Sequence, residues 1–210
     1  MAAAKNKGKS GKTDKRSDQD RLIDAALELA SGMPWQQISI SRIAQQAEVP
    51  IGTALMSLPS RMHILRALMT RIDSAVFGSL ADDPLDGTTK DKLFDILMRR
   101  FDALADHRAA MASIARALGR DPLAAACLAG RFWKSMALSL QAADVSAEGC
   151  TGALRAKALG VIQLSAFRVW LNDDDPGLAA TMKALDKGLS QAEKFSTRHR
   201  PAPADTPETA

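Results

Sequence analysis

Tyrosine is absent from this sequence of 210 residues, and all aromatic residues together make up only 4% of it. Because β-strands favour aromatic and β-branched side chains, this shortage argues against a β-sandwich or a β-barrel. Cysteine occurs only at Cys127 and Cys150, which is too few for a disulfide framework, and we expect a cytoplasmic protein in a reducing compartment. No apolar run approaches the roughly 18 residues of a membrane-spanning helix, so no membrane span is expected.

Alanine, in contrast, is abundant: it fills 38 of the 210 positions, about 18%, and it is the best helix former. Apolar residues recur with a helical period, and no alternation of period two is long enough for a strand. The first helix ends at Gly32 and Pro34, and two short helices follow, which begin at Ser39 or Ser41 and near Gly52. A longer helix is predicted from the N-cap Ser60. Further helices are predicted over Lys90–Ala105, His107–Leu118, Pro122–Ala143, Gly152–Asn172 and Pro176–Phe195. Those that begin at Pro122 and Pro176 start with an Asp-Pro pair. The sequence therefore predicts an all-α fold.

Charge is distributed unevenly along the chain. Residues 1–16 carry six basic side chains and one aspartate, a net charge of +5, whereas the remaining residues sum to −1. We expect this segment to be a disordered basic arm that contacts a polyanion, although a solvated tail that only aids solubility remains open. A turn-rich loop at 82–87 is the predicted boundary between a small unit, 17–80, and a larger helical unit, 81–195. Residues 196–210 are predicted to form a disordered tail.

Three helices at the spacing found in residues 17–80 are typical of a helix-turn-helix, in which a short helix is braced so that its exposed side chains enter the DNA major groove. Residues 21–65 carry paired alanines in the first helix, a Ser-x-x-x-Ile-Ala segment, a valine in the turn, then Gly-Thr and Pro-Ser. These positions are Ala25, Ala26, Leu29, Ser39, Ile43, Ala44, Val49, Gly52, Thr53, Pro59 and Ser60. In order and spacing, the stretch resembles the N-terminal domain of the TetR (tetracycline-repressor-like) family of transcriptional regulators.

The stretch also departs from that family's pattern. Glu48 replaces the usual turn glycine, at a position that favours left-handed backbone geometry. Ile51 replaces a polar or basic residue, Leu55 a tyrosine that commonly touches phosphate, and Leu58 an aromatic residue. Arg61 replaces a lysine and keeps its charge.

The resemblance implies a DNA-binding site in this unit. Thr53, Met56 and Ser57 would contact bases of double-stranded DNA, and the phosphate contacts would come from Ser41, Arg42 and Arg61. None of the three base-facing side chains can make the bidentate contacts of arginine, asparagine or glutamine. Residues 17–73 sum to −1, so we expect the basic arm to supply the charge that attracts DNA.

For the second half, the resemblance implies a cavity for a small apolar ligand and a homodimer formed by the last two long helices. Aromatic and methionine residues at helical spacing are the predicted pocket residues: Phe94, Met98, Phe101, Phe132, Trp133, Met136, Phe167 and Trp170. An anionic end of the ligand would meet Arg99, Arg100 or Arg131. In the dimer, Ala158, Gly160 and Ser165 would permit close approach, and Leu159, Ile162 and Val169 would supply apolar area. Plain core packing, without a pocket or a dimer, remains the alternative interpretation.

A second resemblance concerns residues 153–189, with their Trp170-Leu171 pair, the acidic run before Pro176 and the closing Leu185-Asp186-Lys187. Together with Lys157 and Leu159, these residues resemble the C-terminal part of the lipid-binding accessory proteins of ubiquinone biosynthesis, which share the TetR fold. That resemblance implies binding of an isoprenoid lipid and a vestigial helix-turn-helix.

No catalytic or metal-binding pattern is found. Gly8–Thr13 lacks the spacing of a phosphate-binding Walker A loop, and His63, His107 and His199 have no partner at metal-ligand spacing. Asp173–Asp175 lacks the glycine and distal glutamate of a calcium loop, and is interpreted as a solvated helix-capping loop. We therefore expect no enzyme activity and no cofactor or metal. The sequence favours a ligand-responsive regulator of TetR type; the alternatives are the lipid-binding accessory protein and an unassigned helical interaction protein.

Overall fold

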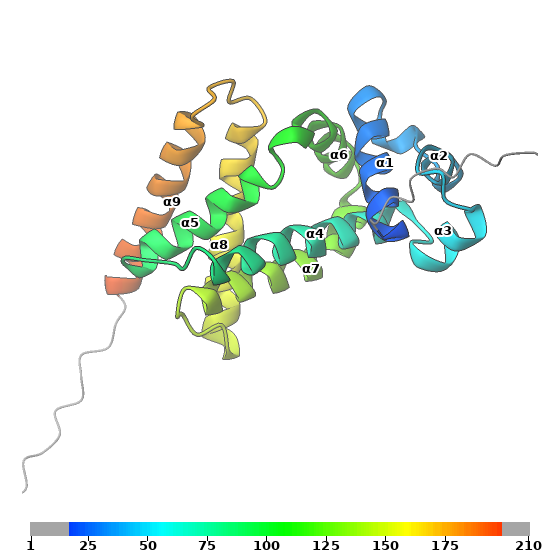
Figure 1. Cartoon of the computed structure of the whole chain (residues 1–210). Coiled ribbons are helices and arrows are strands. Elements are labelled where there is room, and N and C mark those ends of the chain that lie inside the picture. Colours follow the sequence, from blue (N-terminus) through cyan, green and yellow to red (C-terminus); the bar gives the residue numbers. More distant parts are fainter. Residues whose placement is uncertain (1–16, 199–210) are drawn as a thin grey trace, which may run out of the picture.

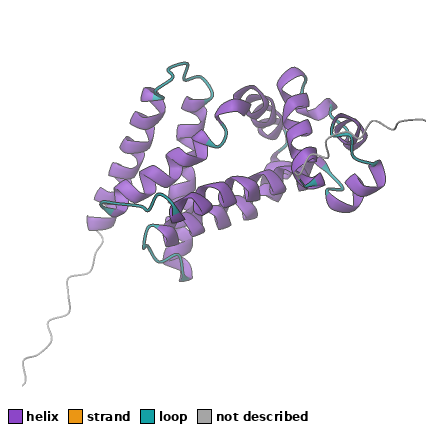
Figure 2. Ribbon diagram, viewed as in Figure 1, coloured by secondary structure: helices purple, strands orange, loops and turns teal. Residues whose placement is uncertain are grey.

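The computed structural model describes residues 17–198, and the predicted basic arm and residues 199–210 of the predicted tail lie outside this range. Within it, all regular structure is helical, which confirms the all-α prediction (Figure 2). The helices are α1 (Asp18–Gly32), α2 (Ile40–Gln46), α3 (Ile51–Ser57), α4 (Arg61–Gly78), α5 (Thr89–Asp102), α6 (Arg108–Arg120), α7 (Pro122–Ala142), α8 (Gly149–Trp170) and α9 (Ala179–Arg198), with short 3₁₀ turns η1 (Trp35–Gln37), η2 (Ser79–Ala81) and η3 (Ala105–His107). None of the described helices is long and apolar enough to cross a membrane.

The buried residues form two clusters that share α4 and α7, the latter contributing Leu128 to the first cluster and Met136 and Leu140 to the second. The first cluster joins α1, α2 and α3 to the N-terminal half of α4, through Ile64 and Leu68, and the second contains Val76 near the C-terminal end of α4 together with α5, α7, α8 and α9. α4 runs lengthwise beside α7 between the small unit and the bundle (Figure 1). α6 packs on α1 and buries Ala110 and Ile114 in the first cluster, although it follows the predicted boundary at residue 80 in the chain. The two clusters are therefore not separated at that boundary.

Side-chain caps fix where several helices start. Ser39 accepts a hydrogen bond from the backbone N–H of Arg42 at 3.2 Å, so Ser39 rather than Ser41 is the N-cap of α2. Ser60 caps α4, and Asp121 caps α7 by accepting from the N–H of Ala124 at 2.9 Å. These starts agree with the sequence prediction.

The predicted start of the last helix at Asp175-Pro176 is wrong, because α9 begins at Ala179. The carboxylate of Asp175 instead closes a turn by accepting from the N–H groups of Gly177 and Ala179. The buried Asp173 accepts from both the N–H and the hydroxyl of Thr181, at 2.8 and 2.7 Å. These hydrogen bonds lower the pKa of Asp173 below its ordinary value, so the first residue of the acidic run is a buried capping group rather than a solvated one.

Glu48, in the turn between α2 and α3, has a left-handed backbone with φ of 52°. Such a conformation is strained for any residue with a Cβ atom. We expect Glu48→Gly to raise the free energy of unfolding by roughly 0.5–1 kcal/mol, since relief of strain exceeds the added entropy of the unfolded chain. Urea denaturation measures the change. The matched control is Glu148→Gly, at a residue with φ of −88°, where no gain is expected. A Glu48→Gly protein less stable than the parent would contradict the argument.

Candidate functional site

The predicted DNA-reading helix, α3, lies at one end of the molecule (Figure 1). Ala54 is fully buried against the first cluster, to which α2 contributes Ile43 and Ala44. The opposite side of α3 is open to solvent, and it carries Thr53 and Met56, the latter 87% exposed. Ser57 is exposed as well, so all three residues predicted to contact bases lie where a duplex can reach them.

Two further exposed side chains on α3 were not assigned a role from the sequence. Ile51 is 45% exposed and Leu55 is 47% exposed, one helical turn apart. Each of the seven residues of α3 has an apolar side chain, a hydroxyl group or, at Gly52, no side chain. None of them carries a charge or an amide group. The helix therefore presents an apolar surface, here called the α3 face and defined by Ile51, Leu55 and Met56.

The residues predicted to contact phosphate differ in their exposure and in their hydrogen bonds to the rest of the chain. Ser41 and Arg42 are exposed on α2. Arg61 is half-buried, and its Nη1 donates to the carbonyl oxygens of Trp35 at 2.9 Å and Gln36 at 2.7 Å. Arg61 thereby completes the C-terminal end of η1, where the carbonyl oxygen of Trp35 also accepts from the N–H of Ile38. Its replacement would loosen η1 as well as remove a charge.

Arg21 serves a similar structural purpose. Its Nη2 donates to the carbonyl oxygens of Ala47 at 2.6 Å and Glu48 at 3.1 Å, at the end of α2. Two arginines of the small unit are thus engaged in holding the short helices in place. Consequently, Arg42 is the better residue for testing contacts with phosphate.

The small unit is joined to α6 by a buried hydroxyl. Ser113 donates to the carbonyl oxygen of Met33 and accepts from the N–H of Trp35, both at 3.1 Å. These two groups lie between the last turn of α1 and the first turn of η1, and no backbone–backbone hydrogen bond is described for either of them. α6 therefore fixes the position of the segment between α1 and α2.

Seven of the eight predicted pocket residues belong to, or pack against, the second cluster, and the eighth, Trp133, lies edge-on to the ring of Phe132. Phe101, Met136 and Trp170 are fully buried. The rings of Phe101 and Phe167 both stack on Trp170, each with centroids 5.6 Å apart. At Gly160, a Cβ atom would lie 2.2 Å from the ring of Trp133. These side chains fill space against one another, and their role as pocket residues remains a prediction.

Two hollows described in the structure lie elsewhere. One of about 450 Å³ is lined by the end of α1, the segment before η1 and α6, with Arg116 and Arg120 at its edge. The other, of about 270 Å³, lies between α1 and the start of α6 and includes His107. Neither is lined by any of the eight predicted pocket residues.

A buried charge cluster ties α4 to α5 and α7. Asp73, only 4% exposed, accepts from Arg100 at 2.8 Å, from Ser135 at 2.6 Å and from Arg131. Arg100 also donates to Ser139 at 3.1 Å. Burial lowers the pKa of Arg100, and the charge of Asp73 opposes this effect. With two cations on one carboxylate, the cluster carries a net charge of +1, and Arg100 Nε and Arg131 Nη1 are buried without a hydrogen-bond partner among the described residues.

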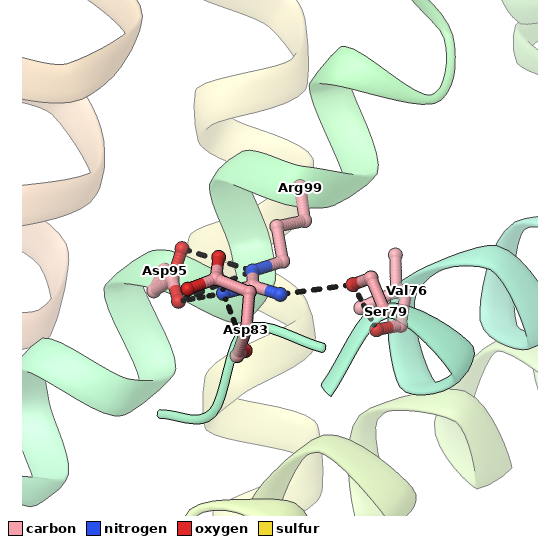
Figure 3. Close-up of polar contacts among 5 residues, drawn as sticks. All are labelled: Val76, Ser79, Asp83, Asp95 and Arg99. Carbon is pink, nitrogen blue, oxygen red and sulfur yellow. Dashed lines mark hydrogen bonds and ion pairs between the residues drawn. The ribbon is translucent and has the colours of Figure 1, made fainter. Parts of the chain in front are cut away.

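Arg99, which is expected from the sequence to be able to meet an anionic ligand end, fixes the connection between α4 and α5 (Figure 3). Its guanidinium contacts Asp95 one turn earlier, the hydroxyl of Ser79 at 2.8 Å and the carboxylate of Asp83 at 2.6 Å. Ser79 in turn donates to the carbonyl oxygen of Val76. The hydrogen bond with Asp95 raises the pKa of Arg99, as expected for a cation held by carboxylates.

An exposed apolar face runs along α8 and reaches α9. Leu154, Val161 and Leu164 of α8 and Met182 of α9 are exposed by 67%, 59%, 40% and 38%. The predicted dimer residues Leu159 and Gly160 are buried, because they pack on the second cluster of their own chain, so this part of the prediction is wrong. We call the four exposed residues the α8–α9 face.

No protein-family model matches the chain, and no curated protein matches it in sequence. Solved structures share its architecture, among them three transcriptional regulators. A TetR transcriptional regulator from Nitrosomonas europaea has a TM-score of 0.70 and 19% identity, over 85% of this chain and 99% of that one. A TetR transcriptional regulator from Rhodococcus sp. RHA1 has a TM-score of 0.62 and 20% identity, over 83% of this chain and 94% of that one. A TetR-family transcriptional regulator from Streptomyces coelicolor has a TM-score of 0.57 and 18% identity, over 87% of this chain and 85% of that one. The chain thus has the fold of the TetR-family transcriptional regulators.

Proposed function

We propose that this protein is a ligand-responsive, DNA-binding transcriptional regulator rather than an enzyme. The observation that carries the proposal is the setting of α3. One side of it is anchored through the buried Ala54, and the opposite side, with Thr53 and Met56, is open to solvent at the end of the molecule. A short helix braced in this way suits insertion into the major groove.

The regulator would act as a homodimer through the α8–α9 face. An exposed apolar face of this kind on two long neighbouring helices suits a symmetric partner, because each copy offers the other the same surface. Two copies of α3 would then read successive major grooves of one duplex.

A small apolar ligand bound in the second half would act through α4. This helix contributes to both buried clusters, and Asp73 links it to α5 and α7. Any ligand that binds better to one arrangement of these helices than to another shifts the population of the two arrangements. A displaced α4 would change the spacing of the two α3 helices and thus the affinity for DNA.

The arm provides a direct test of DNA binding. Residues 1–16 carry a net charge of +5 and precede α1, whereas residues 17–73 sum to −1. We expect deletion of residues 1–16 to weaken binding to DNA from upstream of the protein's own gene. The slope of log affinity against log salt should also become shallower, by about 0.9 for each phosphate that the arm neutralises in the full chain.

Fluorescence anisotropy of that duplex over a series of KCl concentrations gives both quantities. Arg42→Ala in the full chain serves as the companion variant, because the side chain is exposed and its described hydrogen bond goes from Nη1 to the Sδ atom of Met33 rather than to a backbone carbonyl at a helix end. It should weaken binding and reduce the slope by the amount expected for a single phosphate, about 0.9. If the full chain binds no upstream duplex at low salt and is purified with bound isoprenoid lipid, the regulator proposal fails in favour of the lipid-binding alternative.

A further inference from the structure

We infer that the α3 face reads thymine methyl groups in the major groove, so that the operator is selected by apolar contact rather than by hydrogen bonds. This inference rests on the proposed DNA-binding function and names the chemistry by which it discriminates sequences. Its evidence is the composition and exposure of α3, together with the location of charge in the chain.

The chemistry of α3 leaves few ways to distinguish bases. Arginine, lysine, asparagine and glutamine make the paired hydrogen bonds that identify guanine and adenine, and α3 contains none of them. Its exposed hydroxyl groups, on Thr53 and Ser57, can bond to any base. The one distinctive feature of a base pair that apolar side chains detect in the major groove is the C5-methyl group of thymine.

The exposed apolar side chains are arranged for such contacts. Ile51 and Leu55 lie one turn apart on α3, and Met56, the most exposed of the three, follows directly. Met56 has an unbranched, flexible side chain that adapts to an irregular apolar surface. The left-handed turn at Glu48 sets the direction in which the chain enters α3, and the buried Ala54 fixes which side faces inward.

The size of the surface and the charge distribution favour DNA over a protein partner. Three half-exposed or exposed side chains on a seven-residue helix cover far less than the roughly 800 Å² that each partner contributes to a stable protein interface. The small unit carries no excess positive charge of its own, and the +5 segment lies directly before α1 in the chain. A polyanion attracted by that segment can supply the affinity, which leaves the α3 face to supply the selectivity.

The test uses uracil, which differs from thymine only by lacking the methyl group. The full-length protein selects duplexes from a pool with a randomised centre, and the selected duplex is synthesised again with uracil replacing thymine. We expect selection of thymine-containing half-sites and a reduction in affinity of about fourfold for each contacted methyl group, or on the order of tenfold or more in total.

Met56→Ser tests which side chain detects the methyl groups. We expect it to weaken binding to the thymine duplex while leaving binding to the uracil duplex nearly unchanged, which is the coupling expected of a direct contact. Equal affinity of the unmodified protein for the two duplexes would overturn the inference but leave DNA binding intact. Equal weakening by Met56→Ser on both duplexes would also overturn it. If no duplex is enriched in the selection, the proposed function itself fails.

Discussion

Replacing Asp73 by asparagine is expected to lower the free energy of unfolding by about 3–5 kcal/mol. The substitution keeps the size of the side chain but removes the one negative charge between Arg100 and Arg131. Both guanidinium groups would then be buried without a counter-charge, and removing one partner of a buried ion pair is far more costly than removing an exposed pair. Chemical denaturation followed by tryptophan fluorescence measures the destabilisation.

Two further variants distinguish the charge effect from general disruption. Arg131→Gln leaves Asp73 paired with Arg100 in a balanced pair, and should destabilise much less than Asp73→Asn. Asp144→Asn breaks an exposed pair with Lys92, and because asparagine tolerates the left-handed backbone of residue 144, a decrease of about 1 kcal/mol or less is expected. If Asp73→Asn fails to fold, an Arg131→Gln protein that also fails would count against the argument, as would three equal decreases in stability.

The second large effect is expected from Val161→Glu, in the middle of the exposed part of α8. In a dimer formed by the α8–α9 face, two new carboxylates would be buried near the symmetry axis without partners. We expect the dimer to dissociate at concentrations at which the parent protein is fully dimeric, with an association constant lower by at least about a hundredfold. Sedimentation equilibrium measures it, and DNA affinity should fall in parallel.

Leu123→Glu is the matched control, since Leu123 is 75% exposed near the start of α7 and lies outside the α8–α9 face. It introduces the same charge at a helix start that favours acidic residues, and the parent's oligomeric state should persist. Should the Val161→Glu protein remain a dimer with unchanged association, another surface must form the interface. A monomeric parent protein would refute the dimer outright.

Much of the fold was predictable because the signals are local. Alanine content and helical periodicity indicate helices, and short side chains such as Ser39, Ser60 and Asp121 mark their starts by bonding to N–H groups three residues ahead. The start of α9 was missed because its capping carboxylate, Asp173, lies eight residues before the Thr181 that it bonds. An Asp-Pro pair satisfies the local pattern, but a buried contact over a longer distance decides the outcome.

In the candidate site, too, local features were predictable and contacts between distant segments were not. The exposure of Thr53, Met56 and Ser57 follows from helical geometry once Ala54 is taken as the inward residue. Spacing alone does not show that Arg61 is bonded to the carbonyl groups of η1, because the two segments are more than twenty residues apart in sequence. The inward orientation of Gly160 was likewise hidden, since it depends on a close approach by the rings of α7.

The position of α4 in both buried clusters has a consequence for how the protein unfolds. If either half unfolded, α4 would lose part of the apolar packing that buries it. Neither half is therefore a thermodynamically independent module. Any molecule that binds selectively to the folded bundle therefore adds its binding free energy to the stability of the end that carries α3 as well, even though it touches no atom there.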